Sequence, residues 1–179
     1  MRRFAYLAFG MILITTLACS LVSFPKNQTI PPTAQTVDSV SDLQDSALVN
    51  VYDPARNPAD DLKQAVLLAQ KENKHILLEL GGDWCIWCKY MDKFYATHAD
   101  ILQYRAENYV LVKVNVSPEN SNESFLSQFP EAAGYPHIYI LDGDGTFLHS
   151  QNTADLEDGA VSYVPGVFLA FLQKWAPAK

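Results

Sequence analysis

The stretch Gly81-Gly82-Asp83-Trp84-Cys85-Ile86-Trp87-Cys88-Lys89 carries the strongest structural signal in this chain. It holds two cysteines separated by two residues, directly after a run of strand-forming residues. A helix that begins at this point presents unpaired backbone N–H groups and a partial positive charge, which stabilise a thiolate on Cys85. Cys88 lies one helical turn later, close enough to close a short disulfide ring. The pattern therefore predicts a redox-active pair at a strand-to-helix junction.

Length and composition predict one packed domain with an acidic surface. The chain has 179 residues, and 49% of them are hydrophobic, which is enough for a single domain with a core. The formal net charge is −7. A negative surface disfavours nucleic acid and anionic membranes as partners, so we expect no nucleic-acid partner.

The first 18 residues have the pattern of a secretory signal peptide. A basic start, Met1-Arg2-Arg3, precedes an uncharged apolar stretch over residues 4–18. That stretch is shorter than the ~20 residues needed to span a bilayer, so it indicates a signal peptide over 1–18.

The end of this segment, Thr15-Thr16-Leu17-Ala18-Cys19-Ser20, resembles the lipobox of bacterial lipoproteins. The resemblance implies that Cys19 is lipidated, and Ser20 at the next position implies sorting to the outer membrane. Thr16 stands where leucine is usual, so ordinary signal cleavage stays open as an alternative.

The cysteine count supports a catalytic role for the remaining pair. Three cysteines are an odd number for an exported protein, and lipidation of Cys19 leaves one pair. A disulfide between such close neighbours removes little chain entropy, so a purely structural bridge explains it poorly. Residues 19–47 are rich in Ser, Thr, Pro, Gln and Asn, which predicts a flexible tether before a folded domain over 48–179.

Regular hydrophobic patterns predict an α/β domain from about residue 48 onward. Asp60 or Asp61 is the expected cap of the first helix, which ends near residue 73. The expected strands cover 48–52 (a short edge strand), 75–80, 109–116, 137–141 and 146–150, with a hairpin turn at 142–145. The expected helices after the first cover the cysteine pair to about 96, 99–107, 121–129 and 164–175. The inner face of the last helix is predicted to hold Val167, Phe168, Phe171, Leu172 and Trp175.

Residues 48–176 resemble a thioredoxin-fold protein at four separate places. Trp84 precedes the first cysteine, and Glu79 lies six residues before it, where thioredoxins have a buried acid. Lys113 matches the lysine that faces this acid, and Gly134-Tyr135-Pro136 matches the cis-proline segment. The resemblance implies an α/β thioredoxin fold, with a central mixed β-sheet flanked by helices.

The residues between the cysteines, Ile86-Trp87, differ from the Gly-Pro of ordinary thioredoxins. The segment Asp83-Trp-Cys-x-x-Cys-Lys is more similar to the exported thioredoxin-like group, which includes the C-terminal domain of the transmembrane disulfide reductase. Members of that group differ in substrate and direction, so reduction, oxidation and exchange all stay open.

The resemblance implies roles for eight residues. The expected catalytic residues are Cys85 as an exposed attacker, Cys88 as the resolving thiol, Glu79 as proton acceptor, Lys113 as its partner, and Pro136 as a cis-proline that positions substrate. The expected substrate-binding residues are Trp84, Trp87 and Tyr135. A purely structural Glu79–Lys113 pair, an ordinary trans Pro136, and Trp84 as a packing residue are the alternatives.

These features predict an exported, membrane-tethered thiol–disulfide oxidoreductase. Its expected partners are cysteine-containing exported proteins, a redox partner protein, and the membrane through a lipid anchor. We expect no cofactor and no metal site, because the histidines show no ligand spacing and two cysteines supply only half of a zinc site. The alternatives are a non-catalytic adaptor, a module that binds Cu(I) through two soft thiolates, and a scaffold of an envelope complex.

Overall fold

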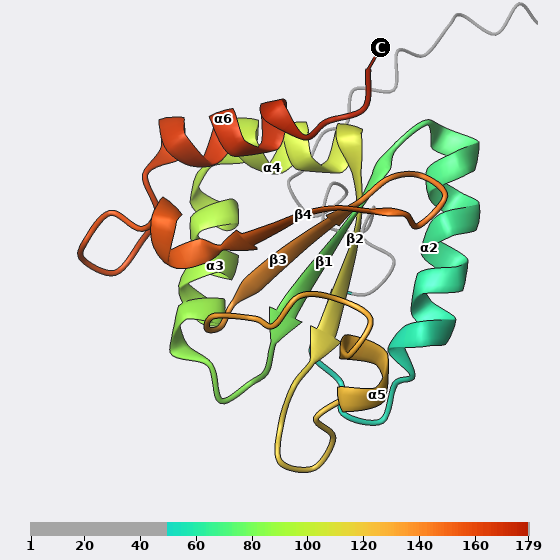
Figure 1. Cartoon of the computed structure of the whole chain (residues 1–179). Helices are drawn as coiled ribbons and strands as arrows, with labels where there is room; N and C mark the ends of the chain where they lie inside the picture. The colour runs from blue at the N-terminus through green and yellow to red at the C-terminus, as the bar shows by residue number, and fades with distance from the viewer. Residues whose placement is uncertain (1–49, 179) are drawn as a thin grey trace, which may run out of the picture. The chain divides into compact units, whose positions relative to one another are not determined.

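The computed structural model describes residues 50–178, in which a four-stranded sheet lies between helices (Figure 1). The predicted signal peptide, the lipidation site Cys19 and the predicted tether lie outside the described residues. Within residues 50–178, no helix has the length and apolar character needed to cross a membrane. The elements follow in the order α2 (Pro58–Glu72), β1 (His75–Gly81), α3 (Ile86–Thr97), α4 (Ala99–Asn108), β2 (Tyr109–Asn115), α5 (Glu123–Leu126), β3 (His137–Leu141), β4 (Phe147–Asn152), the 3-10 helix η1 (Thr153–Leu156) and α6 (Pro165–Lys174).

The sheet is mixed and has the order β2-β1-β3-β4. Strand β1 pairs in parallel with β2 and antiparallel with β3, and β4 pairs antiparallel with β3. The parallel pair needs a crossover, which α3 and α4 supply, whereas the antiparallel pair β3–β4 needs only a turn. The predicted α/β fold with a central mixed sheet is confirmed.

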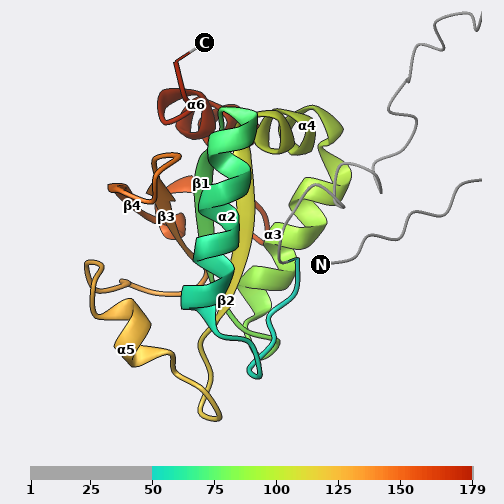
Figure 2. The ribbon, with the colours of Figure 1, turned by 90° about the vertical axis from the view of Figure 1, so that its right-hand side faces the viewer.

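Strand β1 is central and covered on both faces, which explains its continuous apolar sequence. Successive side chains point to opposite faces. Ile76, Leu78 and Leu80 join a core cluster with residues of α2 and α5, whereas Leu77 joins a second cluster with residues of α3, α4 and α6. Figure 2 shows α2 in front of the sheet, on the face opposite α3. Glu79 shares the face of Leu77, so its carboxylate lies on the side of the cysteine helix.

The start of the described region differs from the prediction. Residues 50–52, the described part of the expected edge strand, form no strand. Tyr52 instead turns its side chain into the interior, where it is 7% exposed. Its hydroxyl forms a hydrogen bond with a buried carboxylate, described below, and this long-range contact holds the segment against the domain.

The predicted cap of the first helix is also wrong. Asn57 caps α2 by accepting a hydrogen bond from the backbone N–H of Ala59 at 3.0 Å, and Pro58 occupies the first helical position. Both residues are typical of these positions. Asp60 and Asp61 lie in the first turn, where they favour the helix N-terminus, and Asp61 also pairs with Arg56.

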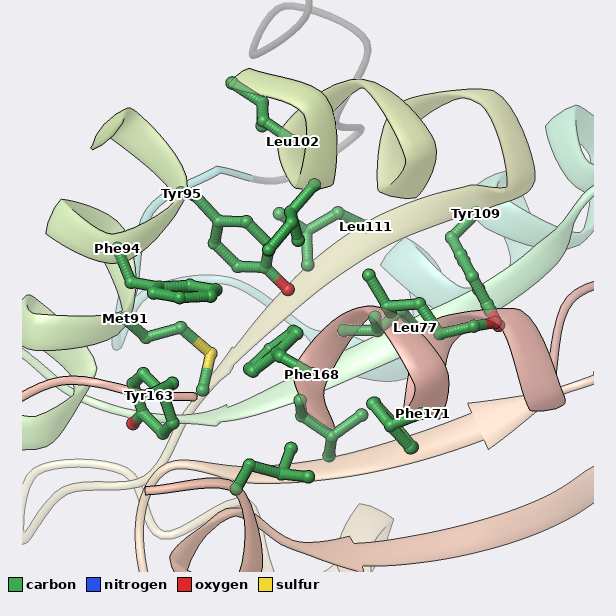
Figure 3. Close-up of a cluster of buried hydrophobic side chains, with 14 of the residues drawn as sticks. Leu77, Met91, Phe94, Tyr95, Leu102, Tyr109, Leu111, Tyr163, Phe168 and Phe171 are labelled. Atoms are coloured by element: carbon green, nitrogen blue, oxygen red, sulfur yellow. The ribbon is translucent and has the colours of Figure 1, made fainter. Parts of the chain in front are cut away.

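Helix α6 closes one core with aromatic side chains (Figure 3). Phe168 is fully buried, and its ring lies 5.0 Å from Phe94 and 5.5 Å from Tyr95 and from Tyr163, measured between centroids. Val167 does not belong to the inner face, since it is 46% exposed. The buried face of α6 consists of Phe168, Phe171 and Leu172 and is therefore smaller than the apolar sequence predicts.

We expect Phe168→Ala to lower the free energy of unfolding by about 3–5 kcal/mol, because it leaves a cavity among three aromatic rings. Val167→Ala, one position earlier on the same helix, should change it by less than about 0.5 kcal/mol because that side chain is exposed. Denaturant unfolding of both variants measures the difference. Equal losses would contradict the assignment of the buried face.

Candidate functional site

The two cysteines lie where β1 passes into α3, as the sequence predicts. Cys85 is the N-cap residue of α3, and the backbone N–H of Cys88 donates a hydrogen bond to Cys85 Sγ at 3.1 Å. The two residues form a disulfide, with their Cα atoms 5.3 Å apart. The first sulfur therefore occupies the place where the N-terminal N–H groups of a helix stabilise negative charge, which favours a thiolate when the bond is reduced.

Both cysteines are buried in the disulfide form, and the expectation of an exposed Cys85 is wrong for this state. Cys85 is 3% exposed and Cys88 is 1% exposed. They form a small buried cluster with Tyr52, against which Trp87 and Tyr135 also pack. Three aromatic side chains therefore surround the sulfurs and limit the approach of small molecules.

Trp84 forms an exposed apolar surface beside this cluster. It is 57% exposed, yet its indole N–H donates a hydrogen bond to the carbonyl of Val116 at 2.7 Å. Its ring also meets that of Tyr135 edge to face, 5.7 Å between centroids. A Cβ at Gly82 would lie 2.5 Å from the indole nitrogen, so only glycine permits this position of the ring. Ile86, 54% exposed, adds a second exposed apolar side chain directly after Cys85.

The Tyr135–Pro136 peptide bond is cis, as the resemblance implies. Pro136 is buried, and its carbonyl accepts a hydrogen bond from the Thr153 hydroxyl at 2.5 Å. Tyr135 contacts both the cysteine cluster and Trp84. The structure thus brings the predicted cis-proline segment to the disulfide, although it lies some fifty residues later in the chain.

Trp87, between the two cysteines, packs inward more than outward. Its ring meets those of Tyr90 and Tyr163 edge to face, at 5.3 and 5.9 Å between centroids. Tyr163 also donates a hydrogen bond to the Trp87 carbonyl at 3.3 Å. Trp87 therefore holds the first turn of α3 against the loop before α6, and part of its surface remains available to a partner.

Glu79 and Lys113 form a buried ion pair beneath the disulfide. They lie opposite each other in the parallel pairing of β1 and β2, with Lys113 Nζ 3.6 Å from Glu79 Oε1. Lys113 Nζ also contacts Asp92 of α3, whose side chain is 54% exposed. Burial lowers the pKa of Lys113, but the carboxylates of Glu79 and Asp92 outweigh it and leave this pKa above its ordinary value. The lysine therefore stays positively charged.

The site contains two residues that the sequence did not indicate, Tyr52 and Asp92. Tyr52 donates a hydrogen bond from its hydroxyl to Glu79 Oε1 at 2.6 Å. Asp92 has one signal in the sequence, because it lies one helical turn after Cys88 on α3 and so faces the same side. Tyr52 has none, since it precedes α2 in an irregular segment.

Among residues 50–178, no group of three or more His, Cys, Asp and Glu side chains is arranged to hold a metal ion. The arrangement can instead carry out thiol–disulfide exchange. It has a sulfur at a helix N-terminus, a second sulfur in disulfide reach, and a buried carboxylate near both.

Residues 57–143 match the family model described as thioredoxin-like. The chain contains a thioredoxin-like domain. A solved structure, the disulphide isomerase from Xylella fastidiosa Temecula1, superimposes on 69% of this chain and 94% of its own with a TM-score of 0.58, at 20% identity. At this identity the likeness supports the fold alone.

Curated relatives are thiol:disulfide interchange proteins. The protein DsbD from Salmonella typhi is 31% identical over 91 residues, which are 51% of this chain and 16% of that protein. DsbD from Citrobacter koseri is 29% identical over 135 residues, or 75% of this chain and 22% of that protein. The similarity therefore concerns one part of much longer relatives.

His137 follows Pro136 and is 2% exposed, with Nε2 hydrogen-bonded to the Ser150 hydroxyl at 2.7 Å. Burial, with a smaller contribution from His149, lowers its pKa to about 4. The folded protein thus disfavours the charged ring. The contribution of neutral His137 to the free energy of unfolding is therefore fully present above the ordinary histidine pKa of about 6.5. It is lost as the pH falls from there toward 4.

When the pH is lowered from 7 to 5, His137 takes up a proton in the unfolded state but stays neutral in the folded state. We expect this difference to lower the free energy of unfolding by about 2 kcal/mol. Denaturant unfolding at both pH values measures this loss. His137→Gln cannot gain the charge, so its stability should fall by about 2 kcal/mol less than that of the wild type over the same interval. An identical pH dependence in the two proteins would contradict the assignment.

Proposed function

We propose that this protein is an exported, membrane-tethered thiol–disulfide oxidoreductase that reduces or exchanges disulfide bonds of other proteins. One observation carries the proposal: Cys85 of the disulfide caps helix α3, and both cysteines pack against Tyr52, whose hydroxyl is hydrogen-bonded to the buried carboxylate of Glu79. A disulfide that only stapled the chain would need neither the helix N-terminus nor a buried charge, which costs free energy unless it is paired.

Reduction of a substrate begins with Cys85. Its thiolate attacks one sulfur of the substrate disulfide, a mixed disulfide forms, and the other substrate sulfur leaves as a thiolate that takes a proton from water. Cys88 then loses its proton and attacks Cys85 Sγ. The Cys85–Cys88 bond forms and the second substrate sulfur leaves, so the substrate gains two electrons and the protein pair loses two. Glu79 accepts the proton of Cys88, and Lys113 balances its charge.

The exposed side chains of Trp84 and Ile86, together with Tyr135, form the surface that we propose meets the substrate protein. Trp84 is fixed by its hydrogen bond to Val116, so little side-chain entropy is lost on contact. Trp87 contributes the part of its ring not packed on Tyr163. Pro136 sets the position of the backbone at Tyr135, where an extended substrate segment can pair.

We propose that the protein is exported and anchored to the outer membrane through lipid on Cys19. The basic start, the apolar stretch and the lipobox-like segment of the sequence support this location. Its partners there are cysteine-containing exported proteins and a redox protein that returns the pair to the dithiol form. The relatives named thiol:disulfide interchange proteins support the same chemistry.

Cys88→Ser should trap partners as mixed disulfides through Cys85, because the resolving thiol is absent. Non-reducing gels of cells that carry this variant, followed by reduction of the trapped bands, measure the outcome. Cys85→Ser is the matched control and should trap nothing. If neither variant traps a partner while the wild type also fails to reduce insulin, the oxidoreductase proposal is wrong. Stoichiometric copper retained on gel filtration would then favour the Cu(I) module.

We expect the equilibrium reduction potential of the pair to lie nearer ~-270 mV than ~-120 mV, because the buried Glu79–Lys113 pair matches the arrangement of reducing thioredoxins. Equilibration with glutathione or dithiothreitol buffers, read by alkylation of the free thiols, measures this potential. A value near ~-120 mV would contradict the reducing direction and assign the protein as a disulfide donor.

A further inference from the structure

Tyr52 belongs to the catalytic centre by position, although it lies outside the motif that carries the cysteines. It is buried, and its hydroxyl donates to Glu79 Oε1 at 2.6 Å. The same side chain forms one buried cluster with Cys85 and Cys88. Tyr52 is therefore the side chain that contacts the redox pair on one side and the buried carboxylate on the other.

The geometry around Gly81 shows how close these groups lie. A Cβ placed on Gly81 would collide with Cys88 Sγ, and it would lie 2.9 Å from the hydroxyl oxygen of Tyr52. Both atoms thus lie within 3.0 Å of a single point. A side chain at the end of β1 would occupy the space beside the hydroxyl and the sulfur, so glycine at position 81 lets both atoms lie there.

Titratable groups on three other segments lie near this pair. Lys113 Nζ of β2 lies 4.8 Å from the centroid of the Tyr52 ring, and Asp92 of α3 contacts the same ammonium. Tyr163 approaches from the loop before α6. Burial and the negative charge of Glu79 hold the pKa of Tyr52 well above its ordinary value. The hydroxyl therefore keeps its proton at neutral pH and acts as donor to Glu79.

The second oxygen of Glu79, Oε2, is buried and has no hydrogen-bond partner within residues 50–178. The carboxylate thus depends on the Tyr52 hydroxyl for its only side-chain hydrogen bond in this region, since Lys113 Nζ is 3.6 Å away. Tyr52 orients the carboxylate of Glu79, the proposed base, and lies beside Cys88, the proposed acid. Its hydroxyl is therefore well placed to pass a proton from Cys88 to Glu79.

We propose that Tyr52 relays the proton of Cys88 to Glu79 during the second step of disulfide exchange. The inference rests on the proposed function. Cys88 S–H gives its proton to the Tyr52 oxygen while the Tyr52 O–H proton passes to Glu79 Oε1. The Cys88 thiolate then forms the bond to Cys85 Sγ, and the substrate sulfur leaves with the electron pair of the broken bond. Tyr52 is unchanged at the end of the step, and Glu79 carries the proton.

The step can be isolated with 5,5′-dithiobis(2-nitrobenzoate) and the reduced full chain. Attack by Cys85 releases one coloured thiolate, and attack by Cys88 releases the second with first-order kinetics. Stopped-flow absorbance from pH 5.5 to 9 gives the rate of the second release. Tyr52→Phe keeps the ring and removes only the hydroxyl. Tyr109→Phe is the matched control, because its buried hydroxyl donates to the Leu172 carbonyl at 2.6 Å near the opposite end of β1.

We expect Tyr52→Phe to slow the second release by about tenfold at pH 6–7, a fraction of the about 10²–10⁴-fold that a positioned acid or base contributes. The deficit should vanish near pH 9, where hydroxide removes the thiol proton. Tyr109→Phe should leave the profile unchanged. A Tyr52→Phe profile equal to that of the wild type, or lowered by one factor at every pH, overturns the relay.

A measurement on the wild type alone keeps the inference testable if Tyr52→Phe does not fold. A relay moves two protons in one step, so the rate of the second release in mixtures of light and heavy water should curve with deuterium content. A straight line would overturn the relay and leave direct transfer to Glu79. Absence of any second release in the wild type would instead count against the proposed oxidoreductase function.

Discussion

The ion pair between Glu79 and Lys113 is the constraint around which the rest of this domain is arranged. Both charges lie inside the buried strands β1 and β2, where an unpaired charge costs several kcal/mol. The parallel register places them opposite each other, Tyr52 adds a hydrogen bond, and Asp92 connects the lysine to the surface. A hydrophobic pair of similar volume would serve stability at least as well, so the charges are better explained by the sulfurs above them than by the fold.

The strands that hold this ion pair are also the features of the sequence that predicted the architecture best. The runs at 75–80 and 109–116 are apolar at most positions, and Glu79, Lys113 and Asn115 are the buried polar residues within them. Such runs are typical of strands covered on both faces, and their lengths exclude long helices. The two glycines before the cysteine pair predicted the point at which its helix begins. The segment Asp142-Gly143-Asp144-Gly145 predicted the hairpin turn.

The errors arose where long-range contacts decide the structure. Tyr52 has a strand-like sequence context, but a buried carboxylate twenty-seven residues later gives its hydroxyl a partner that no local pattern reveals. Val167 fits the apolar period of the last helix, yet nothing covers it within the described region. Trp84 is the reverse case, an exposed aromatic ring whose position depends on the Val116 carbonyl. Tyr52 was thus missed because no local pattern marks it, whereas Lys113 and Pro136, which are also distant in sequence from the cysteines, were found through the resemblance to the thioredoxin fold.

The burial of Cys85 limits access to its sulfur in the disulfide form. In the disulfide form Cys85 is buried in a cluster with Tyr52, against which Trp87 and Tyr135 pack, whereas Trp84 and Ile86 on either side of it are exposed. Under the proposed function, a substrate would meet Trp84 and Ile86 first and would displace part of the aromatic cover to reach the sulfur. Cys88 and Glu79 are both buried, and electrostatic interactions between buried groups are stronger than in water. Because Tyr52 packs against the cysteines and also donates to Glu79, a movement of this ring would change the surroundings of the sulfurs and of the carboxylate together.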